Sequence, residues 1–352
     1  MNGVDLFSII FHTTSDSLGM LFNLLLLYLV VYKTPRQFEV YAILIGNAAV
    51  TDFFACLASL LIQQRIVPVG TSLFYFSHGP CRIIGGEFCY LTYSFMLSCY
   101  THSLYCLLFS FYFRYHVLKK PQFSATKLKL IIVAISLPSL FQFLALRRAT
   151  LNIVKLCLQT MHSNLLFKAM LSEANDPVDK LIPILEKQSP QYNISGETIS
   201  GHEDVFEWRL LTAIFHITLP ITPVYIGILI LRKRIIAMLS TDIMSEHTKR
   251  IHSQLLKAIT YQAFLPGLFS LGVLSYTTGQ LGFFHHPLLE TFTIFSFGLL
   301  PTLSPLMSLH FITPYRWHVR SLFSGGAGKT LPITSDSLTK SVATTSTEVI
   351  YC

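Results

Sequence analysis

The chain has 352 residues, of which 52% are hydrophobic and only 12% are charged, and its formal net charge is +8. A soluble domain of ordinary composition carries about 25% charged residues, so this composition excludes a disordered chain, a coiled coil and nearly every soluble enzyme fold. A positive net charge can also indicate binding to nucleic acid. The positions of the basic residues favour a membrane protein instead, and we expect no nucleic-acid partner.

Seven apolar segments are long enough to cross a lipid bilayer, which requires about 20 apolar residues in a helix. In chain order they are 6–32, 40–62, 87–113, 130–146, 210–231, 258–281 and 288–311. A polar patch at 12–17 interrupts the first segment, and no basic residue precedes it, so we interpret it as a retained helix rather than a signal peptide. The expected fold is an all-α membrane protein, a seven-transmembrane helix bundle.

The distribution of Lys and Arg predicts how this bundle is oriented. If the N-terminus lies outside, the inner segments carry 17 of the 26 basic residues and the two short outer segments carry 2. The rest lie in a long outer loop, 147–209, which exceeds the length over which the positive-inside rule applies. We therefore expect an outside N-terminus and a cytosolic C-terminus. Asn193 lies in that outer loop within an N-x-[ST] sequence, which predicts glycosylation.

The chain divides into a helical domain, 1–320, and a C-terminal tail, 321–352. Ten residues between 330 and 347 are Ser or Thr, which predicts a disordered cytosolic tail. The glycine-rich stretch 325–330 lacks the first glycine of a phosphate-binding loop. We therefore expect no nucleotide and no other cofactor.

Polar side chains inside membrane spans are costly, so each of them needs an explanation. Asp52 lies in the middle of the second span, where it is either a hydrogen-bond node between helices or a conformational switch or ion site. Arg114 stands at the inner end of the third span, where it either snorkels to the interface or forms a contact that changes between two states. Prolines within the spans, Pro266 and Pro305 among them, can act as hinges.

The outer halves of the spans hold a set of aromatic and polar residues. They are Tyr90, Tyr93, Met96, Tyr100, His216 and Glu290. Such residues either anchor a helix at the headgroup level or, facing inward, line a mostly apolar ligand pocket. The chain has no H-E-x-x-H, no G-x-S-x-G and no cysteines at zinc spacing, so we expect neither an enzyme nor a metal site.

The cysteines favour a disulfide bond on the outer side. Cys89 lies at the outer end of the third span, 25 residues before Arg114, which separates the two by roughly 37 Å along a helix. Cys157 lies near the start of the long outer loop, so both thiols would face an oxidising compartment. We expect a Cys89–Cys157 bond, although Cys81 is a rival partner and the sequence leaves the connectivity open.

Several motifs resemble those of rhodopsin-like G-protein-coupled receptors. Asn47, Ala49 and Asp52 have the spacing of the signature in their second helix. Phe113-Arg114-Tyr115 stands where those receptors have D-R-Y, but Phe113 replaces the acid, so Arg114 lacks an acidic neighbour in the sequence. The other matches are Asn23 in the first helix, Phe264-Leu265-Pro266 in the sixth, and Ser304-Pro305 in place of N-P-x-x-Y in the seventh.

A narrower set of motifs resembles the serpentine receptor class delta of nematode chemosensory receptors. The run from His310 to Pro314-Tyr315-Arg316 is similar to the H-x-x-x-P-Y-R ending of these receptors. The further matches are Lys33-Thr34-Pro35, Gln64-Arg65-Ile66-Val67-Pro68, Gly79-Pro80-Cys81 and Phe111-Tyr112-Phe113-Arg114-Tyr115. This resemblance covers about residues 18–320.

The resemblance implies a chemosensory receptor that detects an unidentified small molecule and signals through a heterotrimeric G protein. It also implies a location in the cell membrane of sensory cilia. The expected ligand-binding residues are Tyr93, Met96, Tyr100, His216, Phe264 and Glu290. The expected switch and G-protein-contact residues are Asp52, Arg114, Tyr115, Pro266 and Pro305.

Two other functions are compatible with seven spans. A ligand-gated cation channel of the insect odorant type has its N-terminus inside, which the distribution of basic residues opposes. A transporter should show broken helices in two related halves, and no internal repeat is visible. The receptor is therefore the favoured function.

Overall fold

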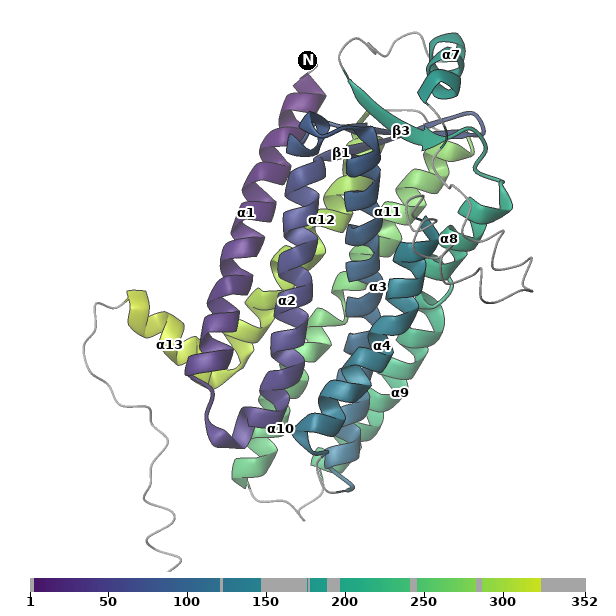
Figure 1. Cartoon of the computed structure of the whole chain (residues 1–352). Helices are drawn as coiled ribbons and strands as arrows, with labels where there is room; N and C mark the ends of the chain where they lie inside the picture. Colours follow the sequence, from purple (N-terminus) through teal and green to yellow (C-terminus); the bar gives the residue numbers. More distant parts are fainter. Residues whose placement is uncertain are drawn as a thin grey trace, which may run out of the picture.

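The computed structural model describes residues 3–120, 123–146, 176, 178–188, 197–240, 246–282 and 287–323. These residues form a bundle of long helices that is covered at one end by a small sheet (Figure 1). The helices of the bundle are α1 (Gly3–Tyr32), α2 (Glu39–Ile62), α3 (Gly86–Val117), α4 (Ala125–Leu146), α8 (Trp208–Thr218), α9 (Ile221–Leu239), α10 (Glu246–Gln262), α11 (Leu265–Gln280) and α12 (Pro287–Phe311). Each predicted span thus lies on one helix or on two consecutive helices.

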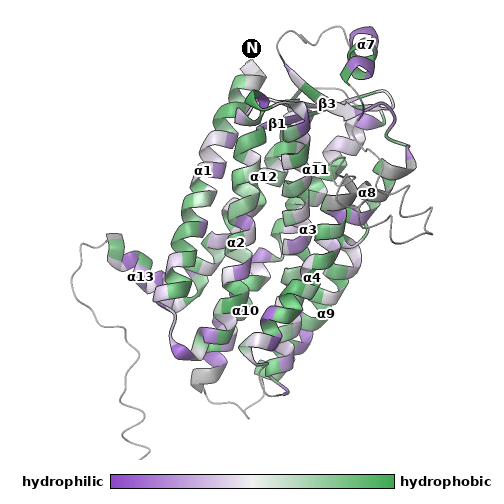
Figure 2. Cartoon of the chain, viewed as in Figure 1, coloured by the Kyte–Doolittle hydropathy of each residue, from purple (hydrophilic) through white to green (hydrophobic). Residues whose placement is uncertain are grey.

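Six segments of the described residues are long and apolar enough to cross a membrane. They are Leu6–Tyr32, Glu39–Ile62, Ala125–Phe143, Ile214–Leu239, Lys249–Gln280 and Leu289–Phe311. Their outward faces are hydrophobic, as Figure 2 shows for α4 and α9. The remaining predicted span is α3, which has 32 residues and many hydroxyl side chains. Because α3 packs against α2, α4 and α9, most of its polar groups face protein rather than lipid, with Tyr112 as an exposed exception.

The polar patch of the first span lies inside an unbroken helix. His12 Nδ1 is 3.2 Å from a carboxylate oxygen of Asp16 and 3.2 Å from Ser59 Oγ on α2. Ser15 Oγ lies 3.4 Å from Thr302 Oγ1 on α12. His12, Ser15 and Asp16 are buried and join α1 to its two neighbours, whereas Thr13, Thr14 and Ser17 of the same patch are exposed.

Two predicted spans are broken in the middle, each close to a proline. α8 ends at Thr218 and α9 begins at Ile221, directly after Pro220. α10 ends at Gln262, and Pro266 lies in the first turn of α11. Proline has no N–H and its ring clashes with the preceding turn, but it fits the first turn of a new helix. Elsewhere, α12 continues through Pro301 and Pro305.

An antiparallel sheet of three strands covers one end of the bundle, so the expectation of an all-α fold is wrong at this point. Its strands, in spatial order, are β1 (Gln64–Val69), β2 (Ser72–Ser77) and β3 (Thr198–His202). Gly70, with φ +58°, permits the tight turn between β1 and β2.

Both faces of the sheet are buried. Alternate residues such as Val67 and Phe74 pack beneath α7 (Val178–Gln188), against Leu181. The residues between them, Ile66 and Tyr75 among them, pack onto the helix bundle. Because successive side chains of a strand point to opposite faces of the sheet, they pack into two separate hydrophobic clusters. The sheet is thereby held between α7 and the helix bundle.

Two bonds attach this sheet region to the bundle. Cys89, in the first turn of α3, is bonded to Cys81 in the short helix η2 (Pro80–Ile83), with a Cα–Cα distance of 5.2 Å. The predicted Cys89–Cys157 bond is therefore wrong, because the nearer cysteine takes Cys89, and Cys157 lies outside the described residues. Arg65 Nη2 on β1 forms an ion pair with Glu290 Oε2 on α12 at 2.8 Å.

At the opposite end, α13 (Thr313–Phe323) follows α12 and leaves the bundle at an angle (Figure 1). Tyr315 at its start is buried, and its hydroxyl lies 3.0 Å from Thr34 Oγ1 after α1. The helix includes residues 321–323, which the prediction assigned to the tail. The rest of that predicted tail, 324–352, lies outside the described residues.

Candidate functional site

The half of α3 nearest the sheet is surrounded by aromatic side chains. Tyr93 and Met96 are buried there in a cluster that includes Tyr75 from the sheet. The rings of Tyr75 and Tyr93 are 4.9 Å apart, and His202 of β3 lies 5.8 Å from Tyr75. Burial raises the pKa of the Tyr75 phenol well above its ordinary value, so this phenol stays neutral. Tyr93 and Met96 therefore belong to a plug below the sheet rather than to the lining of an open pocket.

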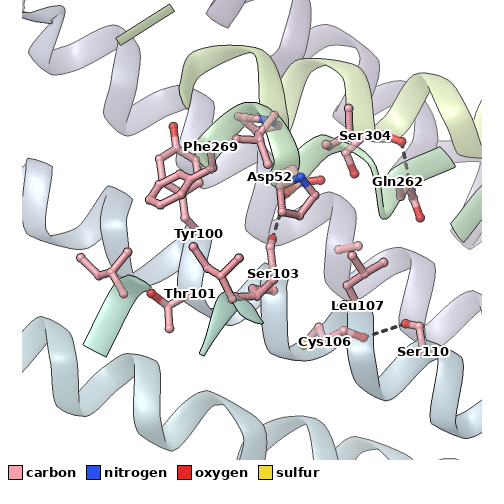
Figure 3. Close-up of a pocket in the computed structure, with 18 of the residues that line it drawn as sticks. Asp52, Tyr100, Thr101, Ser103, Cys106, Leu107, Ser110, Gln262, Phe269 and Ser304 are labelled. Atoms are coloured by element: carbon pink, nitrogen blue, oxygen red, sulfur yellow. Dashed lines mark hydrogen bonds between the residues drawn. The ribbon is translucent and has the colours of Figure 1, made fainter. Parts of the chain in front are cut away.

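A cavity of about 100 Å³ lies deeper in the bundle, where α2, α3, α10, α11 and α12 meet (Figure 3). Most of its lining is apolar, as is usual for ligand pockets. Its polar lining residues are Asp52, Tyr100, Thr101, Ser103, Ser110, Gln262 and Ser304. Ile217 before the α8–α9 break and Pro266 after the α10–α11 break also line it. The cavity is thus placed where two helices are interrupted.

Asp52 is the acidic group of the cavity. It is 7% exposed, and Ser103 Oγ on α3 donates a hydrogen bond of 3.1 Å to Asp52 Oδ1 (Figure 3). Among the described residues, no Lys, Arg or His forms an ion pair with it. A buried carboxylate without a counter-charge is costly, so this site favours a proton, a cation or a hydrogen-bond donor beside Asp52.

Tyr100 supplies a second polar group. Its hydroxyl is buried and has no hydrogen-bond partner among the described residues. Its ring packs edge-on against Phe269 of α11 at a centroid distance of 6.3 Å, and both residues line the cavity (Figure 3). Because buried hydroxyl groups are normally satisfied, this one is available to a molecule in the cavity.

The other predicted ligand residues lie away from the cavity. Phe264 is 71% exposed on the outside of the bundle, because it occupies the break between α10 and α11. Glu290 is engaged by Arg65 at the sheet. His216 is half-buried beside the lining residue Ile217 but does not line the cavity itself. Of the predicted ligand set, the structure brings Tyr100 alone to the described lining.

The predicted switch residues are partly assembled around the same cavity. Asp52 and Pro266 line it, and Pro305 follows the lining residue Ser304. A second cavity of about 30 Å³ is lined by both Asp52 and Arg114. Ser110, Gln262 and Ser304 also line both cavities, so the cavity beside Tyr100 adjoins the one beside Arg114.

Arg114 is buried rather than presented at the surface of the bundle. It is 3% exposed, and its guanidinium carbon lies 5.5 Å from the centre of the Tyr41 ring on α2. With Phe113 in place of an acid, this aromatic face takes over part of the role of a counter-charge. Arg114 is not accessible at the surface in this conformation, and its contact with a G protein stays a prediction. Tyr115 is half-buried, with Lys119 Nζ 4.8 Å from its ring centre.

Sequence reasoning missed Gln262. At the end of α10, its Nε2 donates to the Ser304 carbonyl oxygen at 3.0 Å and to Ser308 Oγ at 3.2 Å, both on α12. A polar residue four positions before Pro266, within an apolar span, was the available signal. Gln262 therefore joins the broken helix to α12 at the level of the cavity.

Comparisons with known proteins identify the family. The family described as "Serpentine type 7TM GPCR chemoreceptor Srd" matches residues 8–321. Serpentine receptor class delta-19 of Caenorhabditis elegans is 37% identical over 320 residues, which cover 89% of this chain and 87% of the relative. Serpentine receptor class delta-18 of the same organism is 36% identical over 318 residues, which cover 88% of this chain and 87% of the relative. The resemblance to the class delta receptors is confirmed, and the family is one of receptors rather than enzymes.

Proposed function

The chain belongs to the Srd family of serpentine seven-transmembrane chemoreceptors, and we propose that it binds a small chemical cue beside Asp52 and activates a heterotrimeric G protein. The observation that carries this proposal is that Asp52 lines both the cavity beside Tyr100 and the adjoining cavity beside Arg114. Asp52 therefore joins a space for a ligand to a buried charged group near the opposite end of α3.

We further propose that the sheet end lies outside the cell and the α13 end in the cytosol. The excess of basic residues in the inner segments supports this orientation. The Cys81–Cys89 bond supports it independently, because disulfides form in oxidising compartments. The N-terminus lies at the same end of the bundle as this bond (Figure 1).

The cavity suggests the size and chemistry of the cue. An engineered cavity of about 150 Å³ binds benzene, so a space of about 100 Å³ fits a smaller molecule, or one of that size after slight adjustment. Asp52 offers a hydrogen-bond acceptor and Tyr100 offers a hydroxyl, while most of the lining is apolar. The expected cue is a small, largely apolar molecule with one or two polar groups, as suits a chemoreceptor in a sensory cilium.

Transmission requires an element that has two arrangements and a ligand that prefers one of them. The α10–α11 break is this element in our proposal, because Pro266 and Gln262 flank it and both line the cavity. A ligand that displaces Gln262 from Ser304 frees α10 to move away from α12. Movement of α10 would uncover Arg114, which now lies beneath it, for the G protein.

The test is a panel of small cues applied to cells that express the receptor, with cAMP, cGMP and calcium as readouts. Tyr100→Ala should lower sensitivity to an active cue and preserve the maximal response. Arg114→Ala should abolish the response and preserve binding. An evoked ionic current that persists in cells lacking heterotrimeric G proteins would instead establish the ligand-gated channel.

A further inference from the structure

A groove separate from the ligand cavity runs between α9 and α10 on the outside of the bundle. Its volume is about 1050 Å³, and it lies towards the α13 end. Four basic residues line it, Arg232, Lys249, Arg250 and Lys257, and none of its described lining residues is acidic. This concentration of positive charge favours an anionic ligand.

The groove changes character along its length. Lys249 and Arg250 lie in the first turns of α10, and Lys257 follows two turns later. Phe264 lies seven residues beyond Lys257, roughly 10 Å deeper along the helix direction. It is 71% exposed and lines the groove. The groove is therefore cationic towards the end of the bundle and aromatic towards the middle of the span.

The deep part of the groove has a fixed apolar wall. Tyr261 stacks on Phe311 of α12, with ring centroids 4.6 Å apart and an interplanar angle of 9°. Phe264 continues this wall beyond the end of α10. Both Tyr261 and Phe264 line the groove within a segment that is apolar enough to span the membrane, so a hydrocarbon chain is the natural neighbour of this surface.

We propose that this groove binds a polyanionic phospholipid, with the headgroup phosphates on the basic residues and an acyl chain along Tyr261 and Phe264. The match of a cationic end to a headgroup and of an aromatic end to a tail distinguishes a lipid from a soluble anion. Four cations favour a headgroup with several negative charges, as in a phosphoinositide. A bound lipid would connect α9 to α10. Since α10 is the first half of the broken span that lines the ligand cavity, the lipid site lies close to the proposed switch.

The experiment measures binding of dioctanoyl phosphatidylinositol bisphosphate to the purified full chain in neutral detergent. Inositol trisphosphate supplies the headgroup alone, and dioctanoyl phosphatidylcholine supplies the tails with a neutral headgroup. Arg232→Gln, Arg250→Gln and Lys257→Gln are combined in one variant, since all three side chains are exposed. Lys120→Gln with Lys129→Gln is the matched control, because these exposed basic residues do not line the groove.

The triple variant should bind the phosphoinositide roughly 100-fold more weakly, at about fivefold for each basic residue removed. The control pair should bind like the wild type. Phe264→Ser should weaken binding of the lipid severalfold while leaving any binding of inositol trisphosphate unchanged, and it keeps the test informative if the triple variant unfolds.

Three results would overturn the proposal. If the control pair lost as much affinity for the phosphoinositide as the triple variant, the effect would come from general surface charge and not from the groove. Equally tight binding of inositol trisphosphate and the lipid would indicate a site for a soluble anion. Unchanged lipid binding by the triple variant would show that these basic residues do not hold the headgroup. None of these measurements depends on the chemical cue or on the receptor's orientation, so the lipid site and the proposed function can fail separately.

Discussion

The Cys81–Cys89 bond gives the most quantitative prediction. It closes a loop with a sequence separation of 8, for which the chain-entropy relation gives about 2.6 kcal/mol of stabilisation at 25 °C. A Cys89–Cys157 bond would close a far longer loop and contribute roughly 4 kcal/mol by the same relation. The two connectivities therefore differ both in the cysteines involved and in the size of the effect.

We expect Cys81→Ser and Cys89→Ser to lower the free energy of unfolding by the same amount, up to about 2.6 kcal/mol. The double variant should be no less stable than either single variant, because each single change already removes the whole bond. The assay is thermal unfolding of the purified receptor, together with mass spectrometry of non-reduced peptides. Cys157→Ser is the control and should match the wild type. If it matched Cys89→Ser instead, the Cys81–Cys89 connectivity would be refuted.

Three further predictions concern the cavity and the sheet. Asp52→Asn should preserve surface expression, because the amide oxygen can still accept from Ser103, but should shift the dose-response curve; an unchanged curve at equal surface level would make Asp52 purely structural. Gln262→Leu removes two hydrogen bonds to α12, worth about 0.6 kcal/mol each in membranes, so basal signalling should rise severalfold. Ser275→Ala, which removes a hydrogen bond from α11 to the Leu289 carbonyl oxygen of α12 away from the cavity, is its control and should leave basal signalling unchanged. Arg65→Glu should reduce surface expression by leaving two buried acids together, and adding Glu290→Arg should restore it; failure of this rescue would show that the ion pair does not hold the sheet.

Apolar length and proline positions predicted the helices well, because the bilayer imposes one requirement on every span. Even α3 was found, although its hydroxyl residues lower its hydropathy. The sheet was missed for a physical reason. Its strands are short and buried on both faces, so they lack the alternation of polar and apolar residues that indicates a strand with one face in water.

The site was predicted less well, because its geometry depends on contacts between distant segments. The sequence places Arg114 at the end of a helix, but only the fold shows that its side chain turns towards Tyr41 and the interior. Likewise, the outer aromatic residues satisfied the pattern for a ligand pocket, yet Tyr75 from an unforeseen strand fills that space. The cysteine pairing also depends on the fold, since the short helix that precedes α3 brings Cys81 to Cys89.

The depth of the cavity has a consequence for signalling. Because the sheet and the aromatic plug occupy one end of the bundle, the space left for a ligand lies beside the α10–α11 break rather than a long distance from it. A ligand in this cavity can therefore act on the α10–α11 break by direct contact, without residues that relay its effect. It has only to bind about 1.4 kcal/mol more tightly to the state in which Gln262 has left α12 in order to shift that equilibrium tenfold. One buried hydrogen bond to Asp52 or Tyr100, formed in a single state, supplies a difference of this size.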